Sequence, residues 1–288
     1  MILENNKNLT ETFSEILSQT LATIVLYNTS LENSITFQSL SKSLNKAGLP
    51  MDILIYDNSE NPQKTPPLTN GWNIHYVHDS TNGGVSKAYN SAFEMAKREG
   101  KKWLLLLDQD TSYPVSAISV YCNSITLHPD QQIFVPRLYD TLGMVSPLKF
   151  NLGGGQRIGY LNRGVYSLHD FKFLNCGAWV STRAFEKAEG YDEQLPLDFS
   201  DFSFIERLKK NQPTFVVTGV TGSHHLATTS VAHVEDRIIR FKSYLKACRY
   251  YKMNYQPDDW RILVRLFFRS LKLSWTHQTF RFVILYFK

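Results

Sequence analysis

A short apolar run that ends in two carboxylates is the feature of this sequence that most constrains its fold. Trp103–Leu107 is long enough for a buried strand and far too short for a membrane-spanning helix. Fully apolar strands are typical of parallel sheets, which deliver the following residues to the edge where ligands bind. Here Asp108 and Asp110 follow, and carboxylates at that edge suit Mg²⁺ or Mn²⁺ shared with substrate phosphates. Taken alone, two such acids are more often an ordinary solvated strand end.

The composition favours a globular protein in a reducing compartment. The chain has 288 residues, of which 43% are hydrophobic, enough for one large domain or one domain with an appendage. Its three widely separated cysteines show neither metal-ligand spacing nor a disulfide framework, which favours the cytosol. Residues 1–20 lack the continuous apolar core of a signal peptide, and no run of about 20 apolar residues predicts a membrane-spanning helix.

Strands and helices are predicted to alternate along the first half of the chain. This order is typical of an α/β fold with a mostly parallel sheet flanked by helices. Strands are predicted over residues 21–28, 51–59, 73–77 and 103–107, and helices over 30–44, 85–98 and 114–128. From residue 134 the pattern is less regular. The glycine-rich segment 153–159 is interpreted as a flexible loop, and the later predictions are strands over 173–180 and 215–217 and helices over 182–189 and 199–210.

Polar residues follow successive predicted strands and are therefore expected to meet at one edge of the sheet. They are Asn28, Asp57, the turn Asn82-Gly83-Gly84, and the pair Asp108 and Asp110. In order and spacing this set resembles the family 2 glycosyltransferases of the GT-A fold, and within them the bacterial rhamnosyltransferase-like branch. The segments that carry the resemblance are residues 25–28, 56–59, 82–90 and 105–110, with a block over 177–201 that resembles the family's acceptor side. The resemblance covers roughly residues 20–230 and does not explain the C-terminal tail. The chain is therefore expected to divide into an N-terminal extension over residues 1–20, a GT-A catalytic domain over 21–235, and a basic amphipathic helical region over 236–288.

The resemblance implies a divalent metal site. Transfer from a nucleotide sugar leaves negative charge on a departing diphosphate, and a cation bound to its phosphates lowers the barrier. By similarity Asp110 is the direct ligand of Mg²⁺ or Mn²⁺, while Asp108 lies beside it, toward the donor or bound through water. His224, after a late predicted strand, matches the family's further ligand, and His225 is the alternative.

Donor-binding residues are implied in the same way. Asp57 is expected to accept a hydrogen bond from the nucleotide base or ribose, and the alternative is an acid that caps a turn. Glycines after a strand let the backbone pass close to the donor. Lys87 is expected near a phosphate or in solvent. The full set of donor-side expectations is Tyr27, Asn28, Asp57, Asn82, Gly83, Gly84, Lys87, Asp108, Asn175, Gly177 and Arg207.

An inverting transfer also needs a general base that takes the proton of the acceptor hydroxyl. The matching segment carries Asp198 and Asp201, where the family more often has a Glu-Asp pair. Asp201 is the first choice and Asp198 the second, and their spacing of three places both on one side of a helical turn. The alternative for Asp201 is a helix N-cap. Arg207, six residues later, is expected to pair with Asp201 or to reach a phosphate.

The C-terminal region is strongly basic. Residues 237–288 contain twelve Lys or Arg and two acidic residues, whereas the residues before them carry a net negative charge. Over residues 260–275, Arg261, Arg265, Arg269 and Lys272 share one face of a predicted helix with a tryptophan at each end. This pattern favours a helix that lies on an anionic membrane surface, and the alternative is a helix docked on the protein's own core with a solvated basic face. No nucleic-acid motif accompanies the charges, so nucleic acid is not expected as a partner.

The predicted function is an inverting, metal-dependent glycosyltransferase. It would move rhamnose or another hexose from a UDP- or dTDP-sugar to a lipid-linked or surface-polysaccharide acceptor, as a peripheral protein at the cytoplasmic face of the membrane. Two other functions stay open. A nucleotidyltransferase also uses acids at a sheet edge, but it needs a glycine-rich phosphate loop where this chain has Tyr27-Asn28-Thr29-Ser30. A non-catalytic membrane-associated scaffold would retain the fold.

Overall fold

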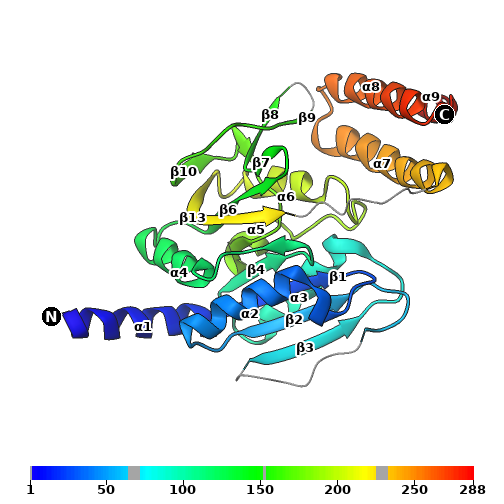
Figure 1. Ribbon diagram of the computed structural model, residues 1–288. Helices are drawn as coiled ribbons and strands as arrows, with labels where there is room; N and C mark the ends of the chain where they lie inside the picture. Colours follow the sequence, from blue (N-terminus) through cyan, green and yellow to red (C-terminus); the bar gives the residue numbers. More distant parts are fainter. Residues whose placement is uncertain (1, 64–71, 152–153, 225–232) are drawn as a thin grey trace.

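Within the described residues, a ten-stranded mixed sheet forms the centre of the protein (Figure 1). The computed structural model describes residues 2–63, 72–151, 154–224 and 233–288. The strand order is β10-β13-β6-β12-β4-β1-β2-β3, with β5 beside β13 and β7 beside β6, while β8, β9 and β11 form a small second sheet. The strands are β1 (Thr20–Leu26), β2 (Asp52–Asp57), β3 (Asn73–His78), β4 (Trp103–Leu107), β5 (Thr111–Ser112), β6 (Ile133–Asp140), β7 (Gly143–Ser146), β8 (Leu148–Asn151), β9 (Gly154–Gln156), β10 (Gly164–Ser167), β11 (Phe171–Lys172), β12 (Ala178–Ser181) and β13 (Thr214–His224). The helices are α1 (Ile2–Ser18), η1 (Leu31–Asn33), α2 (Ile35–Ala47), α3 (Gly84–Arg98), α4 (Ala117–Leu127), α5 (Thr182–Lys187), α6 (Ser200–Leu208), α7 (Val234–Tyr255), α8 (Arg261–Thr276) and α9 (Arg281–Phe287).

The parallel half of the sheet explains why polar residues gather at one edge. β1 lies between β2 and β4, β3 flanks β2, and all of these pairs are parallel. In β4, Leu104 and Leu106 enter one core and their neighbours enter the other, because successive strand residues point to opposite faces. Leu26 lies opposite Asp57 at the ends of β1 and β2, so the chain leaves both strands at the same edge. The predicted α/β fold with a mostly parallel sheet is confirmed.

The other half of the sheet differs from the sequence prediction. Residues 133–140, where the pattern is irregular, form β6, and β12 begins only at Ala178. β13 continues to His224 instead of ending at residue 217, and residues 154–156 of the expected flexible loop form the short strand β9. The reason is pairing between distant segments: β12 lies antiparallel between β4 and β6, and β13 runs parallel to β6. Such pairing outweighs local propensity.

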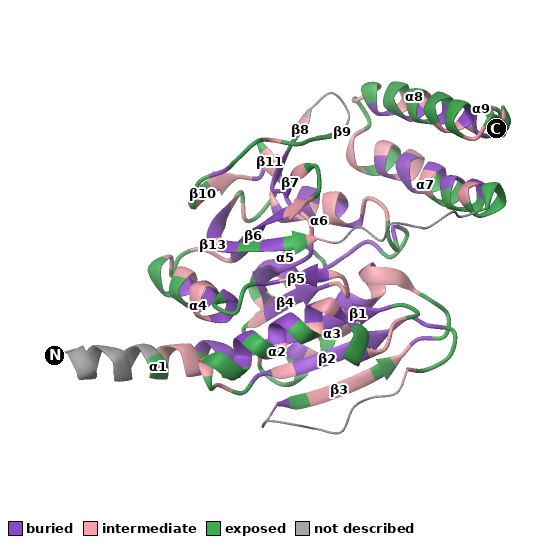
Figure 2. Cartoon of the chain, in the orientation of Figure 1, coloured by how far each residue is buried: buried purple, intermediate pink, exposed green. Residues whose placement is uncertain are grey.

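Helices cover both faces of the sheet. α1, α2 and α4 pack on one face, and α3, α5 and α6 pack on the other, where Phe185 and Phe204 are fully buried. The expected N-terminal extension contributes to the first of these cores, because Ile16 and Leu17 of α1 are buried in it. Figure 2 shows the buried residues concentrated on the central strands and on the inner sides of the helices.

The C-terminal helices α7, α8 and α9 lie together and form a third apolar cluster against the body of the protein (Figure 1). Phe199 stacks on Tyr251 of α7, with ring centroids 5.1 Å apart. Lys172 is buried, where it pairs with Glu206 and donates a hydrogen bond of 3.0 Å to the hydroxyl of Tyr251. No helix among the described residues is both long and apolar enough to cross a bilayer.

Helix α8 has three distinct faces. Its inner face buries Ile262 and Leu266. The adjacent basic face borders an open cavity, which Arg265, Arg269 and Lys272 line. The outer face carries a row of exposed apolar side chains, which are Trp260, Val264, Phe268, Leu271 and Trp275. The helix therefore docks on the protein's own core, as the second interpretation of its sequence predicted. Its basic side chains Arg265, Arg269 and Lys272 are exposed, as that interpretation also predicted, and they border the cavity as well.

Candidate active site

An open cavity of about 1030 Å³ lies at the carboxyl edge of β1 and β4. Its walls come from these strand ends, the turn before α3, the start of α6 and the segment before it, the end of β13, and α7. The predicted site residues that line it are Tyr27, Asn82, Gly84, Asp108, Asp110, Asn175, Asp198, Asp201 and His224. Residues from six separate stretches of the sequence thus surround one space.

The two carboxylates after β4 lie beside a histidine from the far end of the chain. β13 pairs with β5, directly after Asp110, and this pairing places His224 next to both acids. His224 Nδ1 is 3.5 Å from Oδ2 of Asp108 and 3.7 Å from Oδ1 of Asp110. The thiol of Cys176 donates to Oδ2 of Asp108, and ligand atoms of Asp108, Cys176 and His224 lie within 4.8 Å of one another. His225, the alternative ligand, lies outside the described residues.

The chemistry of this cluster fits a divalent cation. Oδ1 of Asp108 is buried and has no hydrogen-bond partner among the described residues. Burial, and then the negative charge of Asp108, raise the pKa of Asp110 well above its usual value. The negative charge of Asp108 therefore opposes the ionisation of Asp110. A cation would compensate both charges and supply the missing partner, and carboxylate oxygens suit Mg²⁺ or Mn²⁺.

Gln109, between the two carboxylates, holds the end of β1. Its side-chain amide accepts a hydrogen bond of 2.7 Å from the Tyr27 N–H and donates one of 3.3 Å to the Tyr27 carbonyl. Asn28 follows with a φ of 50° and donates its N–H to Ser59 Oγ at 2.8 Å. Tyr27 and Gln109 line the cavity, whereas Asn28 does not.

The turn before α3 brings backbone to the cavity wall. Asn82 and Gly84 both have positive φ angles, 51° and 80°. A Cβ atom on Gly84 would lie 2.2 Å from the carbonyl oxygen of Pro196, so this position requires glycine. The Val85 N–H donates to the same carbonyl at 2.8 Å, which fixes the segment before α6 against the turn. Gly83 lies between two lining residues but does not line the cavity itself.

Two other predicted donor residues belong to polar networks behind the cavity. Lys87 forms an ion pair of 2.9 Å with Asp79. Asp57 is fully buried and accepts hydrogen bonds from the hydroxyl of Tyr76 at 2.6 Å and from two backbone N–H groups. Burial raises the pKa of Asp57, but these hydrogen bonds outweigh it and hold the pKa below its usual value. The carboxylate thus fills the turn-capping role, and its neighbour Asn58 lines the cavity instead.

The two candidate bases near the start of α6 differ in their partners. Asp198 makes a two-pronged ion pair with Arg240 of α7, with an Nη2–Oδ1 distance of 2.7 Å. Asp201 lies in the first turn of α6, and the N-cap is Phe199, so the N-cap interpretation of Asp201 is wrong. Among the described residues Asp201 has no ion pair. Burial raises its pKa to about 7, although hydrogen bonds from Asn175 lower it. A carboxyl group that titrates near neutrality suits acid–base work.

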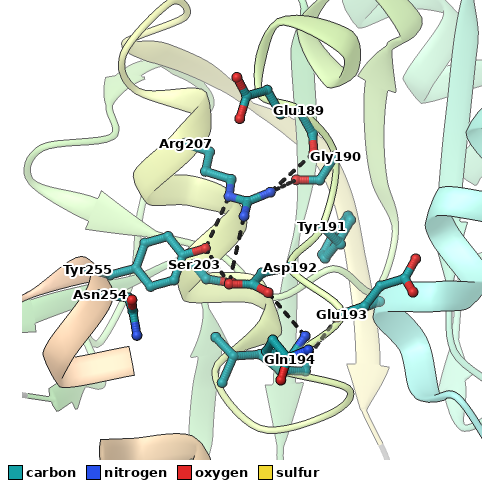
Figure 3. Close-up of polar contacts among 12 residues, drawn as sticks. Glu189, Gly190, Tyr191, Asp192, Glu193, Gln194, Ser203, Arg207, Asn254 and Tyr255 are labelled. Carbon is teal, nitrogen blue, oxygen red and sulfur yellow. Dashed lines mark hydrogen bonds and ion pairs between the residues drawn. The ribbon is translucent and has the colours of Figure 1, made fainter. Parts of the chain in front are cut away.

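Arg207 and Gly177 lie outside the cavity. Nε of Arg207 donates to the hydroxyl of Tyr255 at 3.0 Å, and its guanidinium is 3.7 Å from Asp192 (Figure 3). The Tyr255 hydroxyl donates to Asp192 at 2.7 Å, so this group ties the end of α7 to the segment before α6. The expected pairing of Arg207 with the base does not form. Gly177 packs beside β4, where a Cβ would lie 2.9 Å from the hydroxyl of Tyr121.

Several residues that line the cavity were not predicted from the sequence. Arg240 and Lys246 come from α7, which the sequence pattern assigned to the tail, so no local signal indicated that they face the site. Tyr89 and Cys176 also line it. Tyr89 lies within a segment that carries the family resemblance, and Cys176 directly precedes another, so these segments were the available signal.

Comparison with known proteins identifies the family that residues 6–148 match. Residues 6–148 match Glycosyl transferase family 2. The fold is similar to the crystal structure of S. aureus TarS 1-349 in complex with UDP-GlcNAc, with a TM-score of 0.52 and 12% identity over 88% of this chain and 81% of that one. A second structure of S. aureus TarS has a TM-score of 0.44 and 14% identity over 88% of this chain and 43% of that one. No curated protein matches the chain in sequence. The chain therefore carries a glycosyl transferase family 2 domain with the GT-A fold and is a glycosyltransferase.

Proposed function

We propose that this glycosyltransferase moves a hexose from a nucleotide-diphosphate sugar with inversion, assisted by Mg²⁺ or Mn²⁺. One observation carries the proposal: the same cavity holds two neighbouring carboxylates, one with a buried and unpartnered oxygen, and a separate carboxyl that titrates near neutrality. The first pair suits a cation shared with a donor diphosphate. The separate carboxyl suits a general base.

The residues of the cavity divide the reaction between them. Asp108, Asp110 and His224 would hold the cation, which neutralises the charge that the departing diphosphate gains. Asp201 accepts the proton of the acceptor hydroxyl while the hydroxyl oxygen bonds to the anomeric carbon and the bond from that carbon to the diphosphate breaks. Attack from the side opposite the leaving group inverts the anomeric configuration. Because Gly84 has no side chain, the Pro196 carbonyl packs against this turn and fixes the cavity wall beside the donor.

Asp201 is the better candidate for the base. Asp198 has both carboxylate oxygens engaged by Arg240 in a two-pronged contact, so they are already occupied by a partner. Asp201 has a pKa of about 7, so near neutral pH it is partly deprotonated and still a strong enough base to take a proton in the transition state. Asp198 then has a positioning role, because it holds Arg240 of α7 against the cavity.

The donor is a UDP- or dTDP-sugar. The TarS structure holds UDP-GlcNAc, which supports a uracil nucleotide. Among the side chains that line the cavity, Asn58 and Asn82 offer amide donors and acceptors for a base or ribose, and Tyr27 offers an aromatic ring. The transferred sugar is rhamnose or another hexose, and the acceptor is a lipid-linked or surface-polysaccharide glycan.

The C-terminal region supports a place at the cytoplasmic face of a membrane. Along α8 the exposed apolar row ends in Trp275, which is 88% exposed, and it continues on α9 with Phe280 and Phe287. A row of this kind on a basic helix is typical of an interfacial helix, whose apolar side enters the boundary between headgroups and acyl chains. The apolar row, rather than the basic face, is the part that enters the lipid.

Nucleotide binding and donor hydrolysis test the proposed activity. Calorimetry with UDP and with dTDP in the presence of Mn²⁺ should detect binding, and a panel of nucleotide sugars should release nucleotide in a metal-dependent reaction. The Asp110→Ala variant should lose both metal dependence and turnover. Absence of nucleotide binding would favour the scaffold, and full activity of Asp110→Ala would overturn the metal assignment.

Co-sedimentation with vesicles tests the membrane surface. The full chain should bind vesicles that contain anionic phospholipid, and the Trp275→Ser variant should bind them roughly thirtyfold less, because burial of one large aromatic side chain contributes about 2 kcal/mol. Leu127→Ser is the matched control, since Leu127 is exposed on α4, far from the tail in the sequence. Equal binding by both variants and the wild type would reject the apolar row as the contact surface.

A further inference from the structure

A second cavity adjoins the donor cavity at the candidate base. It has a volume of about 690 Å³ and lies between α6, α7, α8 and the segment around β8 and β9. The two cavities share Leu174, Leu197, Asp198, Asp201 and Arg240 as lining residues. A molecule that occupies the second cavity can therefore present a hydroxyl to Asp201 while the donor occupies the first.

Positively charged side chains outnumber negatively charged ones among the residues that line the second cavity. Its acidic residues are Asp198 and Asp201, and the first of these is already paired with Arg240. The other cations come from α8, namely Arg265, Arg269 and Lys272, and none of the three forms an ion pair with any described residue. Clefts lined by one sign of charge concentrate ions of the opposite sign. The cavity is therefore suited to an anion.

The basic side chains of this cavity and their surroundings indicate which class of anion it binds. Arg269 lies over the ring of Tyr244, with its guanidinium carbon 3.9 Å from the ring centroid, so the ring holds it in place. Arg265 lies against the backbone of Gly154, where a Cβ would come within 2.1 Å of its Nη1. Two guanidinium forks and an ammonium group match the several oxygens of a phosphate. Phe150, among other aromatic residues, adds an apolar surface for a sugar ring or a lipid chain.

We infer that the acceptor carries a phosphate group, which Arg265, Arg269 and Lys272 bind while the reacting hydroxyl lies at Asp201. This inference rests on the proposed function, because it assigns the acceptor of the same reaction. It also explains why the exposed basic side chains of α8 border the reaction site.

The phosphate has two chemical sources. One is a diphosphate that links the acceptor glycan to a lipid, and the other is a phosphate or phosphodiester of a soluble glycan. Phe268 lines the second cavity and also belongs to the exposed apolar row of α8. A lipid chain that leaves the cavity would therefore meet the surface that we propose to contact the membrane.

Binding of phosphate-bearing probes to the UDP- and Mn²⁺-saturated full chain tests the inference. The soluble probe is glucose 1-phosphate, compared with methyl glucoside. The lipid probe is a polyprenyl diphosphate-linked sugar in phosphatidylcholine vesicles, compared with an alkyl glycoside in the same vesicles. The double variant Arg265→Gln/Lys272→Gln removes two cations that make no ion pair. Lys42→Gln is the matched control, because Lys42 is an exposed cation on α2 that lines neither cavity.

The wild type and Lys42→Gln should bind a phosphate-bearing probe better than its uncharged counterpart. The double variant should bind that probe at least about tenfold more weakly, since a hydrogen bond to a charged group contributes roughly a factor of ten in affinity. The charge-conserving variant Arg265→Lys/Lys272→Arg should retain most of the binding, and added salt should weaken it. Binding of the soluble probe assigns a free phosphate, and binding of the vesicle probe alone assigns the lipid-linked diphosphate.

Equal binding of charged and uncharged probes, or equal binding by the wild type and the double variant, would overturn the phosphate site. UDP binding in Mn²⁺ separates this failure from a failure of the proposed function. If the wild type binds UDP but the probes show no charge dependence, only the acceptor inference is wrong. If the wild type does not bind UDP, the glycosyl-transfer proposal itself fails.

Discussion

Replacement of Asp201 by asparagine isolates the role of one proton acceptor. The change keeps the size of the side chain and its capacity for hydrogen bonds with Asn175, but it removes the negative charge. If Asp201 is the general base, the turnover number should fall by about 10²- to 10⁴-fold, while affinity for UDP in Mn²⁺ should stay within a few-fold of the wild type. The matched variant is Asp198→Asn, which should lose less activity because Arg240 already occupies its carboxylate.

The pH dependence of the wild-type turnover number tests the role of Asp201 independently. Burial raises the pKa of Asp201 to about 7, so the carboxyl holds its proton below that pH and cannot take another. The deprotonated fraction is roughly one tenth at one pH unit below the pKa and roughly nine tenths at one unit above. The turnover number should therefore rise about tenfold between pH 6 and pH 8. This rise should be absent from the residual activity of Asp201→Asn.

The assay is the initial rate of UDP release from a UDP-sugar that the panel identifies as a donor. Both donor and Mn²⁺ are kept saturating, so that the titration of the metal ligands does not contribute to the turnover number. A wild-type rate that stays level between about pH 6 and pH 8, or full activity of Asp201→Asn, would refute the assignment of the base.

Three other predictions follow from contacts in the site. Mn²⁺ binding near pH 7 should release protons and strengthen as the pH rises, because burial and the charge of Asp108 raise the pKa of Asp110 and the cation displaces the retained proton. Calorimetry in buffers of different ionisation enthalpy measures the proton release, and identical heats in all buffers would contradict it. In urea unfolding, Gly84→Ala should lower the free energy of unfolding by more than the roughly 1–2 kcal/mol that a left-handed residue costs, because its Cβ would also clash with a backbone carbonyl. Gly100→Ala, at a φ of 67° with open space around it, should lose only the cost of the left-handed conformation. Arg207→Ala should lower the free energy of unfolding by about 1–3 kcal/mol without changing UDP affinity, since its partners are a tyrosine, a carboxylate and two backbone carbonyls outside the cavity. A loss of UDP affinity would show that it acts in the donor site.

The first half of the fold is predictable because its signals are local. Each parallel strand is a short apolar run followed by polar residues, and this pattern alone indicates both the strand and the edge at which it ends. Asp108 and Asp110 were found in this way. The strand β6 was not predicted, and β12 and β13 were predicted with other bounds, because their partners are distant in sequence and backbone pairing, not local pattern, determines where they begin and end.

The roles of individual charged residues were less predictable than their positions. Asp57 and Lys87 occur at the expected places in the chain, yet each is engaged by partners behind the cavity. Arg207, expected beside the base, instead joins the end of α7 to the segment before α6. A side chain several bonds long reaches many partners, and sequence spacing does not indicate which of them lies within hydrogen-bond distance.

The sequence by itself determined the α/β class, the edge of the sheet at which the acids lie, and the two carboxylates after the apolar run. These features depend on periodicity and on the order of polar and apolar residues, which a linear chain displays. Only the tertiary structure decided that His224 lies beside Asp108, that Asp198 is held by Arg240 while Asp201 has no ion pair, and that the basic face of α8 borders the reaction site. Each of these depends on how distant segments pack, because burial and opposing charge arise only when the folded chain brings the groups together.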